Sequence, residues 1–207
     1  MTELFENLEP KKKERILNAA LEEFAENGYK RASTNKIVRQ AGIGKGMLFY
    51  YFQNKQELYH YLLQYAMDII MEEYFQRIDL SETDFVERLK QAAQVKMQCF
   101  SRHPHIFNFM GTFLLASEEQ LPENLQTRFE TLQREGNARI YDNIDRTLFR
   151  DDIDVEKAYH LIQWAIEGYQ NHLKNKLKGE KMTSIDMSYY WDEFYEYLDV
   201  LKKTFYE

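Results

Sequence analysis

Apolar residues recur at helical spacing along almost the whole 207-residue chain, and this pattern constrains the fold more than any other feature. No stretch alternates apolar and polar residues between turn signals, as a half-buried strand would. Only three prolines and eight glycines interrupt the pattern. The sequence therefore predicts an all-α fold of about nine helices without a sheet.

Residues that begin or end helices divide the pattern into segments. Pro10 suits the first turn of a first helix, and Gly28 is expected to end it. Ser33 is expected to cap a second helix and Asn54 a fourth, with Glu57 placed to complete a capping box. The remaining helices are expected over residues 45–52, 55–78, 82–102, 105–116, 122–149, 155–177 and 184–206.

The stretch from Ser33 to Lys55 has the design of a helix-turn-helix, with two short helices joined by a glycine turn. Gly42 can take the positive φ that lets the helices cross steeply. Leu48 and Phe52 are four residues apart, so they can pack the second short helix against its neighbours. This packing is expected to leave four side chains pointing outward: Lys45, Met47, Tyr50 and Tyr51.

The charge distribution is compatible with a polyanionic partner for this stretch. The net charge of the chain is −7, yet residues 27–56 carry six Lys or Arg and no Asp or Glu. A basic stretch inside an acidic protein is where nucleic acid could dock. A basic stretch of this length could also arise by chance. The prediction of DNA binding therefore rests on the helix-turn-helix rather than on the charge.

The same stretch resembles a known family. The order Thr34, Ala41-Gly42-Ile43, Lys45-Gly46, Leu48, Phe52 and Lys55 is similar to the DNA-binding domain of TetR-type (tetracycline-repressor-like) regulators, over about residues 12–62. The resemblance implies a helix-turn-helix DNA-binding domain at 1–55 and a helical ligand-binding and dimerisation domain at 56–207. It also implies a repressor that binds a palindromic double-stranded DNA operator as a homodimer, until a small-molecule inducer releases it.

The resemblance also implies which residues contact DNA, with the helix over residues 45–52 lying in the major groove. For Lys36, a solvent-exposed side chain without a DNA contact is an equally good interpretation. Two positions depart from the family pattern, because Gly44 replaces a common capping serine and Phe49 replaces a common tyrosine. The candidate DNA-binding residues are Thr34, Asn35, Lys36, Lys45, Gly46, Met47, Tyr50, Tyr51 and Lys55.

The last two predicted helices carry apolar stripes with heptad-like spacing. Two neighbouring stripes of this kind can form a four-helix interface between two copies, or each can pack within its own chain. The resemblance favours dimerisation. The candidate interface residues are Val155, Ile162, Met187, Trp191, Phe194, Leu198, Leu201 and Phe205.

The resemblance also places a ligand pocket in the C-terminal domain. Aromatic residues make up 15% of the chain and can line such a pocket, although the same residues can simply fill a core. A lipophilic ligand such as a drug, dye or acyl chain is expected, and the acidic charge of this domain leaves a cationic ligand open. The candidate lining residues are Met97, Phe100, Phe109, Phe113, Trp164 and Tyr169.

No motif in the sequence points to an enzyme, a metal or a cofactor. The five histidines are scattered, and Glu156 with His160 supplies only two of the ligands that a closed metal site needs. The single cysteine, Cys99, excludes an internal disulfide, and no signal peptide or membrane span is expected, so the cytoplasm is favoured. The alternative functions are a helical protein-interaction module and a transcriptional activator of the same fold.

Overall fold

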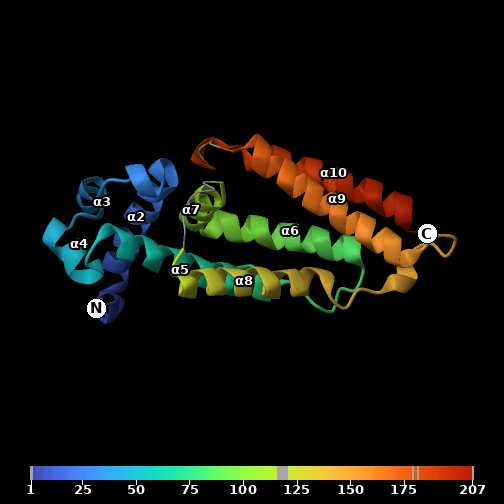
Figure 1. Ribbon diagram of the computed structural model, residues 1–207, viewed down its shortest axis with the longest axis horizontal. Coiled ribbons are helices and arrows are strands. Elements are labelled where there is room, and N and C mark those ends of the chain that lie inside the picture. Colours follow the sequence, from blue (N-terminus) through green and yellow to red (C-terminus); the bar gives the residue numbers. More distant parts are fainter. Residues whose placement is uncertain (1, 116–120, 179, 181, 207) are drawn as a thin grey trace. The chain divides into compact units, whose positions relative to one another are not determined.

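The computed structural model describes residues 2–115, 121–178, 180 and 182–206 (Figure 1). The described residues form ten α-helices, three short 3₁₀ helices and no β-strand, which confirms the all-α prediction. The helices are α1 (Thr2–Glu6), α2 (Pro10–Arg31), α3 (Thr34–Ala41), α4 (Lys45–Phe52), α5 (Lys55–Glu73), α6 (Phe85–Arg102), α7 (Pro104–Leu115), α8 (Glu123–Tyr141), α9 (Val155–Lys176) and α10 (Met187–Phe205). The 3₁₀ helices are η1 (Phe75–Arg77), η2 (Arg146–Leu148) and η3 (Met182–Ser184).

The chain folds as two compact units, each of which is described by itself. The first unit comprises residues 1–69, 100–129 and 179–184, and the second comprises residues 70–99, 130–178 and 185–207. The first unit is therefore not one continuous N-terminal segment, because α7 and η3 join the helix-turn-helix.

The local signals around the helix-turn-helix have the structures that the sequence predicts. Gly42 ends α3 in the left-handed region with φ of 66°, and the Ser33 side chain accepts a hydrogen bond from the Lys36 N–H. Asn54 Oδ1 accepts from the Glu57 N–H at 2.9 Å at the start of α5. Gly28 differs from the expectation: its φ of 64° kinks α2, which then continues for one short turn to Arg31.

Helix α1 is an element that the sequence analysis did not anticipate. Its Phe5 is fully buried, with its ring centroid 4.7 Å from that of Phe52 and 5.7 Å from that of Tyr51. Five residues give too short a stretch for a helical period to be recognised. The helix is held by the aromatic cluster that it covers.

Helix α7 packs against α2 within the first unit. The ring of Phe109 lies against those of Phe24 and Tyr59, and all three side chains are buried. Thr112 Oγ1 donates a 2.8 Å hydrogen bond to the Ala25 carbonyl. Residue 116, where this helix was expected to end, lies outside the described residues.

Two later helices are shorter than predicted for local reasons. Helix α8 ends at Tyr141 rather than near residue 149, because Asn143 adopts φ of 57° and Asp145 caps the separate helix η2. Helix α6 begins at Phe85 rather than residue 82, because Asp84 Oδ1 accepts from the N–H groups of Val86 and Glu87.

The core of the second unit lies between α6, α9 and α10, which run alongside one another in Figure 1. Arg88 on α6 is fully buried inside this unit, and within the described residues it donates only to backbone carbonyls. Its Nη1 donates to the Asp142 carbonyl at 2.5 Å, and its Nε donates to that of Glu82 at 2.7 Å. A cation beside the last carbonyls of α8 also complements the negative end of that helix dipole.

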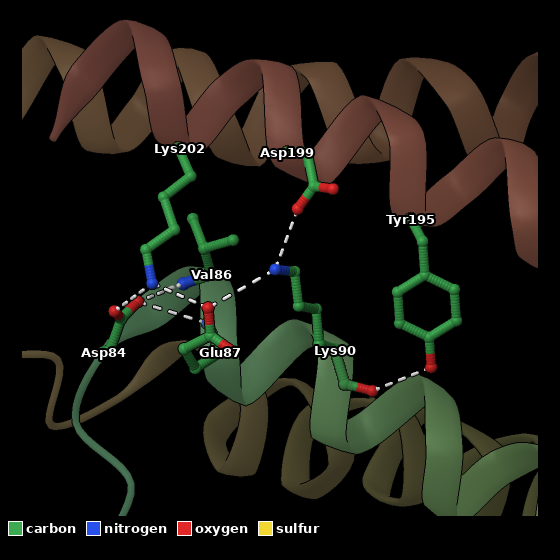
Figure 2. Close-up of polar contacts among 7 residues, drawn as sticks. All are labelled: Asp84, Val86, Glu87, Lys90, Tyr195, Asp199 and Lys202. Carbon is green, nitrogen blue, oxygen red and sulfur yellow. Dashed lines mark hydrogen bonds and ion pairs between the residues drawn. The ribbon is translucent and has the colours of Figure 1, made fainter.

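A polar network ties α6 to α10, as Figure 2 shows. Lys202 Nζ lies 2.8 Å from Asp84 Oδ2 and 2.6 Å from Glu87 Oε1. Lys90 Nζ lies 2.9 Å from Asp199 Oδ1, and the Tyr195 hydroxyl donates to the Lys90 carbonyl at 3.2 Å. Burial alone would raise the pKa of Asp84, but the hydrogen bonds from Lys202 and from the Glu87 N–H lower it below its ordinary value.

Candidate nucleic-acid interface and ligand cavity

Helix α4 presents one exposed face with a cation, a bare backbone and two large side chains. Its buried side packs Leu48 and Phe52 into the first unit, and both are at most 2% exposed. On the outer side Met47 is 39% exposed and Tyr50 is 57% exposed. The face consists of Lys45, Gly46, Met47 and Tyr50.

The prediction that Tyr51 points outward is wrong. Its side chain is only 3% exposed and lies between the rings of Phe5 and Phe52. Helix α1 covers this side of α4, so Tyr51 belongs to the aromatic core of the first unit. Tyr50 is therefore the tyrosine of this pair that is available to a partner.

On helix α3, Lys36 is already engaged by carboxylates of α2. Its ammonium lies 2.8 Å from Glu23 Oε2 and 3.6 Å from Glu26 Oε2. Glu23 is buried, and its other carboxylate oxygen accepts from the Ser33 N–H at 2.9 Å. The hydrogen bond with Glu23 raises the pKa of Lys36 above its ordinary value. This arrangement fixes the start of α3 against α2.

The remaining candidates lie at helix starts. Thr34 and Asn35 occupy the first turn of α3, with Thr34 half-buried and Asn35 exposed. At the start of α5, the half-buried Lys55 donates to the Lys30 carbonyl at 3.2 Å and lies over the Tyr29 ring. The first-turn N–H groups of a helix suit a phosphate.

The second unit contains a cavity of about 140 Å³. Helix α6 contributes Ala92 and Lys96 to its wall, and α10 contributes Trp191. The wall is otherwise apolar or aromatic, with Gln170 as a further polar residue. The other lining residues are Tyr74, Leu89, Ala93, Ile140, Tyr141, Ile166, Tyr169, Leu173, Met187, Tyr190 and Phe194.

Of the six predicted ligand-binding residues, the structure places Tyr169 in the wall of this cavity. Phe109 is buried in the first unit, and Phe100 and Phe113 belong to the same unit. The ring of Phe100 makes an edge-to-face contact with Phe107, and that of Phe113 makes one with Phe129. Met97 and Trp164 are exposed, at 36% and 61%. Sequence reasoning missed Lys96, Tyr74 and Tyr141, because no local pattern marks a side chain that borders a cavity.

The predicted interface residues mostly pack within their own chain. Ile162 and Leu198 are fully buried in the core of the second unit. Val155, Leu201 and Phe205 pack against that core, while Met187, Trp191 and Phe194 line the cavity. The exposed apolar residues of α9 and α10 are instead Leu161, Trp164, Tyr189, Tyr197 and Val200.

An exposed second helix after a glycine turn, on a compact three-helix support, defines a helix-turn-helix protein. Residues 16–62 match the family of bacterial regulatory proteins, tetR family, and residues 83–205 match the tetracyclin repressor-like C-terminal domain. The chain belongs to the TetR family. It is a DNA-binding transcriptional regulator and not an enzyme.

Similar proteins agree with this assignment. The fatty acid metabolism regulator protein of Bacillus subtilis (strain 168) is 34% identical over 164 residues, which are 73% of this chain and 78% of that protein. A TetR family regulator from Chloroflexus aurantiacus is 24% identical with a TM-score of 0.62, covering 99% of this chain and 98% of that chain. FadR from Bacillus subtilis, solved in complex with stearoyl-CoA, is 20% identical with a TM-score of 0.51, covering 91% and 96%. Within the described residues, no helix is long and apolar enough to cross a membrane.

Proposed function

We propose that this regulator is a homodimeric repressor that binds a near-palindromic DNA operator in the cytoplasm and leaves it when a small apolar ligand binds the second unit. The observation that carries the proposal is the exposed face of α4, with Lys45 and Tyr50 on a buried support. Lysine can donate to guanine and methionine can contact a thymine methyl group. Residues 1–55 are the proposed DNA-binding part of the chain.

The proposed DNA contacts fall into two groups. Lys45, Gly46, Met47 and Tyr50 meet the major groove from α4, and Phe49 supplies no hydroxyl. Thr34, Asn35 and Lys55 lie at helix starts, where N–H groups and short polar side chains contact phosphate. Lys36 is left out of this set, because its ammonium is neutralised by Glu23 and Glu26.

The dimer is proposed to form through the outer faces of α9 and α10. Leu161 and Trp164 on α9 are 48% and 61% exposed, and Tyr197 and Val200 on α10 are 50% and 59% exposed. Clusters of exposed apolar residues commonly mark protein interfaces. The residues buried behind them, Ile162 and Leu198, hold this surface in place rather than touching the partner. Two-fold symmetry would place two α4 helices roughly 34–36 Å apart, one turn of DNA.

The ligand is proposed to occupy the cavity of the second unit. Its wall is mainly apolar and aromatic, which suits a lipophilic group. The Bacillus subtilis relatives named above are a fatty acid metabolism regulator and a regulator that was solved with stearoyl-CoA. A ligand can release DNA only by binding more tightly to the conformation that does not fit the operator.

The test is a titration of the purified protein onto duplex DNA from upstream of its own coding region, beside a scrambled duplex. Two chains per duplex, with a clear preference for the upstream fragment, would support the proposal. Equal binding to both duplexes at all salt concentrations would reject this fragment, and DNA selected from a random pool would then supply the operator. Failure to enrich any sequence would overturn operator recognition.

A reporter gene behind the selected operator separates repression from activation. A repressor lowers expression when the regulator is present, and deletion of the regulator restores it. Higher expression in the presence of the regulator would overturn repression in favour of activation.

A further inference from the structure

The cavity of the second unit carries a charge pattern that specifies its ligand further. Lys96 is the one lysine, arginine or acidic residue among those that line it. Its ammonium lies 5.7 Å from the centroid of the Trp191 ring, which also lines the cavity. Lys96 as a whole residue is exposed, while its ammonium is buried against the wall of the cavity.

Lys96 lacks the partner that a structural lysine has. Among the described residues no carboxylate forms an ion pair with it, whereas Lys90, one turn and a half earlier on α6, is paired with Asp199. Burial lowers the pKa of Lys96, because it removes the ammonium from water, and no neighbouring charge offsets this effect. An anion bound in the cavity beside the ammonium would supply the missing partner.

The other polar groups around the cavity agree with an anion. Tyr74 and Tyr141 line it, and neither hydroxyl forms a hydrogen bond with another described residue. The Lys176 ammonium lies 5.3 Å from the centroid of the ring of Tyr190, which is a lining residue. The acidic Glu193 is occupied, because its Oε2 accepts from the Tyr169 hydroxyl at 2.8 Å.

We propose that this cavity binds an organic anion, with the apolar body against Trp191 and Phe194 and the anionic group on Lys96. The proposal rests on the ligand-released repressor described above and names the class of its ligand. The cavity volume of about 140 Å³ is close to that of a cavity that holds one benzene ring, so the enclosed part of the ligand is small. A longer body would extend through the mouth. The charge of Lys96 argues against the cationic ligand that the acidic domain had left open.

The two helices that would contact the ligand, α6 and α10, are held together by polar contacts outside the cavity. Helix α6 supplies Lys96 and α10 supplies Trp191, and the ion pair of Lys90 with Asp199 joins the same two helices (Figure 2). The hydrogen bond from Tyr195 to the Lys90 carbonyl lies in the same network. The two contacts of the proposed ligand therefore need little rearrangement of the helices.

The test uses Trp191 as a local reporter in the full-length protein. The chain has two tryptophans, and the exposed Trp164 is replaced by phenylalanine so that fluorescence comes from the cavity alone. Octanoate, octanoyl-CoA, 1-octanol and octylammonium are titrated in parallel. They share the apolar chain and differ in the head group.

The expected result is a response to one or both of the anions at concentrations about ten-fold lower than for 1-octanol, because a charge-assisted contact is gained. Octanoate alone would indicate a free carboxylate as the ligand class, and octanoyl-CoA alone a phosphorylated thioester. Lys96→Met should abolish the preference for the anion but keep the response to 1-octanol, and Lys96→Arg should retain the preference. Lys203→Met, on the exposed side of α10, is the matched control.

A preference for octylammonium or for the uncharged alcohol would overturn the proposal, as would a preference for the anion that survives Lys96→Met. Operator binding is measured separately with the same ligands in the protein that keeps Trp164, because this residue lies on the proposed dimer surface. Anion binding at Trp191 without release of DNA would leave the cavity proposal standing and reject release by ligand. Absence of operator binding in the apo protein would reject the repressor instead.

Discussion

The ammonium of Lys36 lies 2.8 Å from the buried carboxylate of Glu23, and this pair joins the first turn of α3 to the middle of α2. Glu23 also accepts from the Ser33 N–H, so one carboxylate serves both the cap and the following turn. The pair makes Lys36 part of the support for the DNA-binding face rather than part of the face.

Lys36→Met is therefore expected to lower the stability of the protein without changing the salt dependence of DNA binding. Removing the ammonium leaves a buried carboxylate oxygen without its partner. Thermal melting should show a lower midpoint than in the wild type, and the double variant Glu23→Gln with Lys36→Met should recover part of the loss. A reduced salt dependence in Lys36→Met would show instead that this lysine contacts phosphate.

Tyr50 and Tyr51 are expected to respond in opposite ways to replacement by alanine. Tyr51→Ala should cost about 3 kcal/mol of unfolding free energy, because it empties a buried aromatic site. Tyr50→Ala should leave stability within about 0.5 kcal/mol and weaken operator binding. Urea unfolding and DNA titration of both variants provide the comparison, and equal stability losses would contradict the burial difference.

Arg88→Met should destabilise the second unit by about 2–4 kcal/mol, because several backbone carbonyls lose the hydrogen bonds that this buried side chain donates. The methionine keeps the apolar stem but supplies no hydrogen bond. Urea unfolding at neutral pH measures the loss. Arg150→Met, at an exposed ion pair with Asp152, is the control and should change stability by less than about 1 kcal/mol.

The Lys202–Asp84 ion pair predicts a pH dependence of stability. The pKa of Asp84 is lowered in the folded state, so its contribution is present above its unfolded pKa of about 3.9 and is lost as the pH falls through the folded value. Lys202→Met should cost about 1 kcal/mol or less at neutral pH, since the pair is partly exposed. The difference from the wild type should shrink towards about pH 3 in urea unfolding. A difference that stays constant with pH would mean that packing, not charge, causes it.

If α9 and α10 form the dimer surface, acidic side chains introduced there should dissociate the dimer into monomers. Trp164→Glu with Val200→Glu should give monomers in sedimentation experiments, because both side chains are exposed in the single chain and would face the partner. Leu80→Glu, at another exposed apolar residue, should leave the dimer intact. A dimer that persists in the double variant would place the interface elsewhere.

The sequence was informative where a local signal determines a local structure. Gly42 needs its positive φ, and the side chains of Ser33 and Asn54 find N–H groups within one turn. These signals depend on neighbours in the chain, so they can be recognised without the fold. The starts of α3 and α5 follow from the Ser33 and Asn54 caps, and the end of α3 follows from Gly42.

The features that could not be predicted from the sequence depend on contacts between residues that are far apart in the chain. Phe5 covers Tyr51 across 46 positions of sequence, which no periodicity reveals. The heptad stripe of α10 predicted an interface, yet Trp191 and Phe194 face a cavity of their own chain. A stripe shows which side of a helix is apolar and does not identify its neighbour. For the same reason Lys96 could not be recognised as part of the ligand site.

The central claim is that α4 reads DNA through its exposed face, and the salt dependence of Lys45→Met tests it most directly. Binding to the operator duplex is measured across a range of salt concentrations for the wild type, Lys45→Met and the control Lys203→Met. The account predicts that Lys45→Met binds more weakly and, if the lysine neutralises a phosphate, loses about 0.9 from the slope of log affinity against log salt. If it contacts a base instead, the preference over a scrambled duplex falls at an unchanged slope. Affinity, slope and preference all equal to those of the wild type would contradict the account.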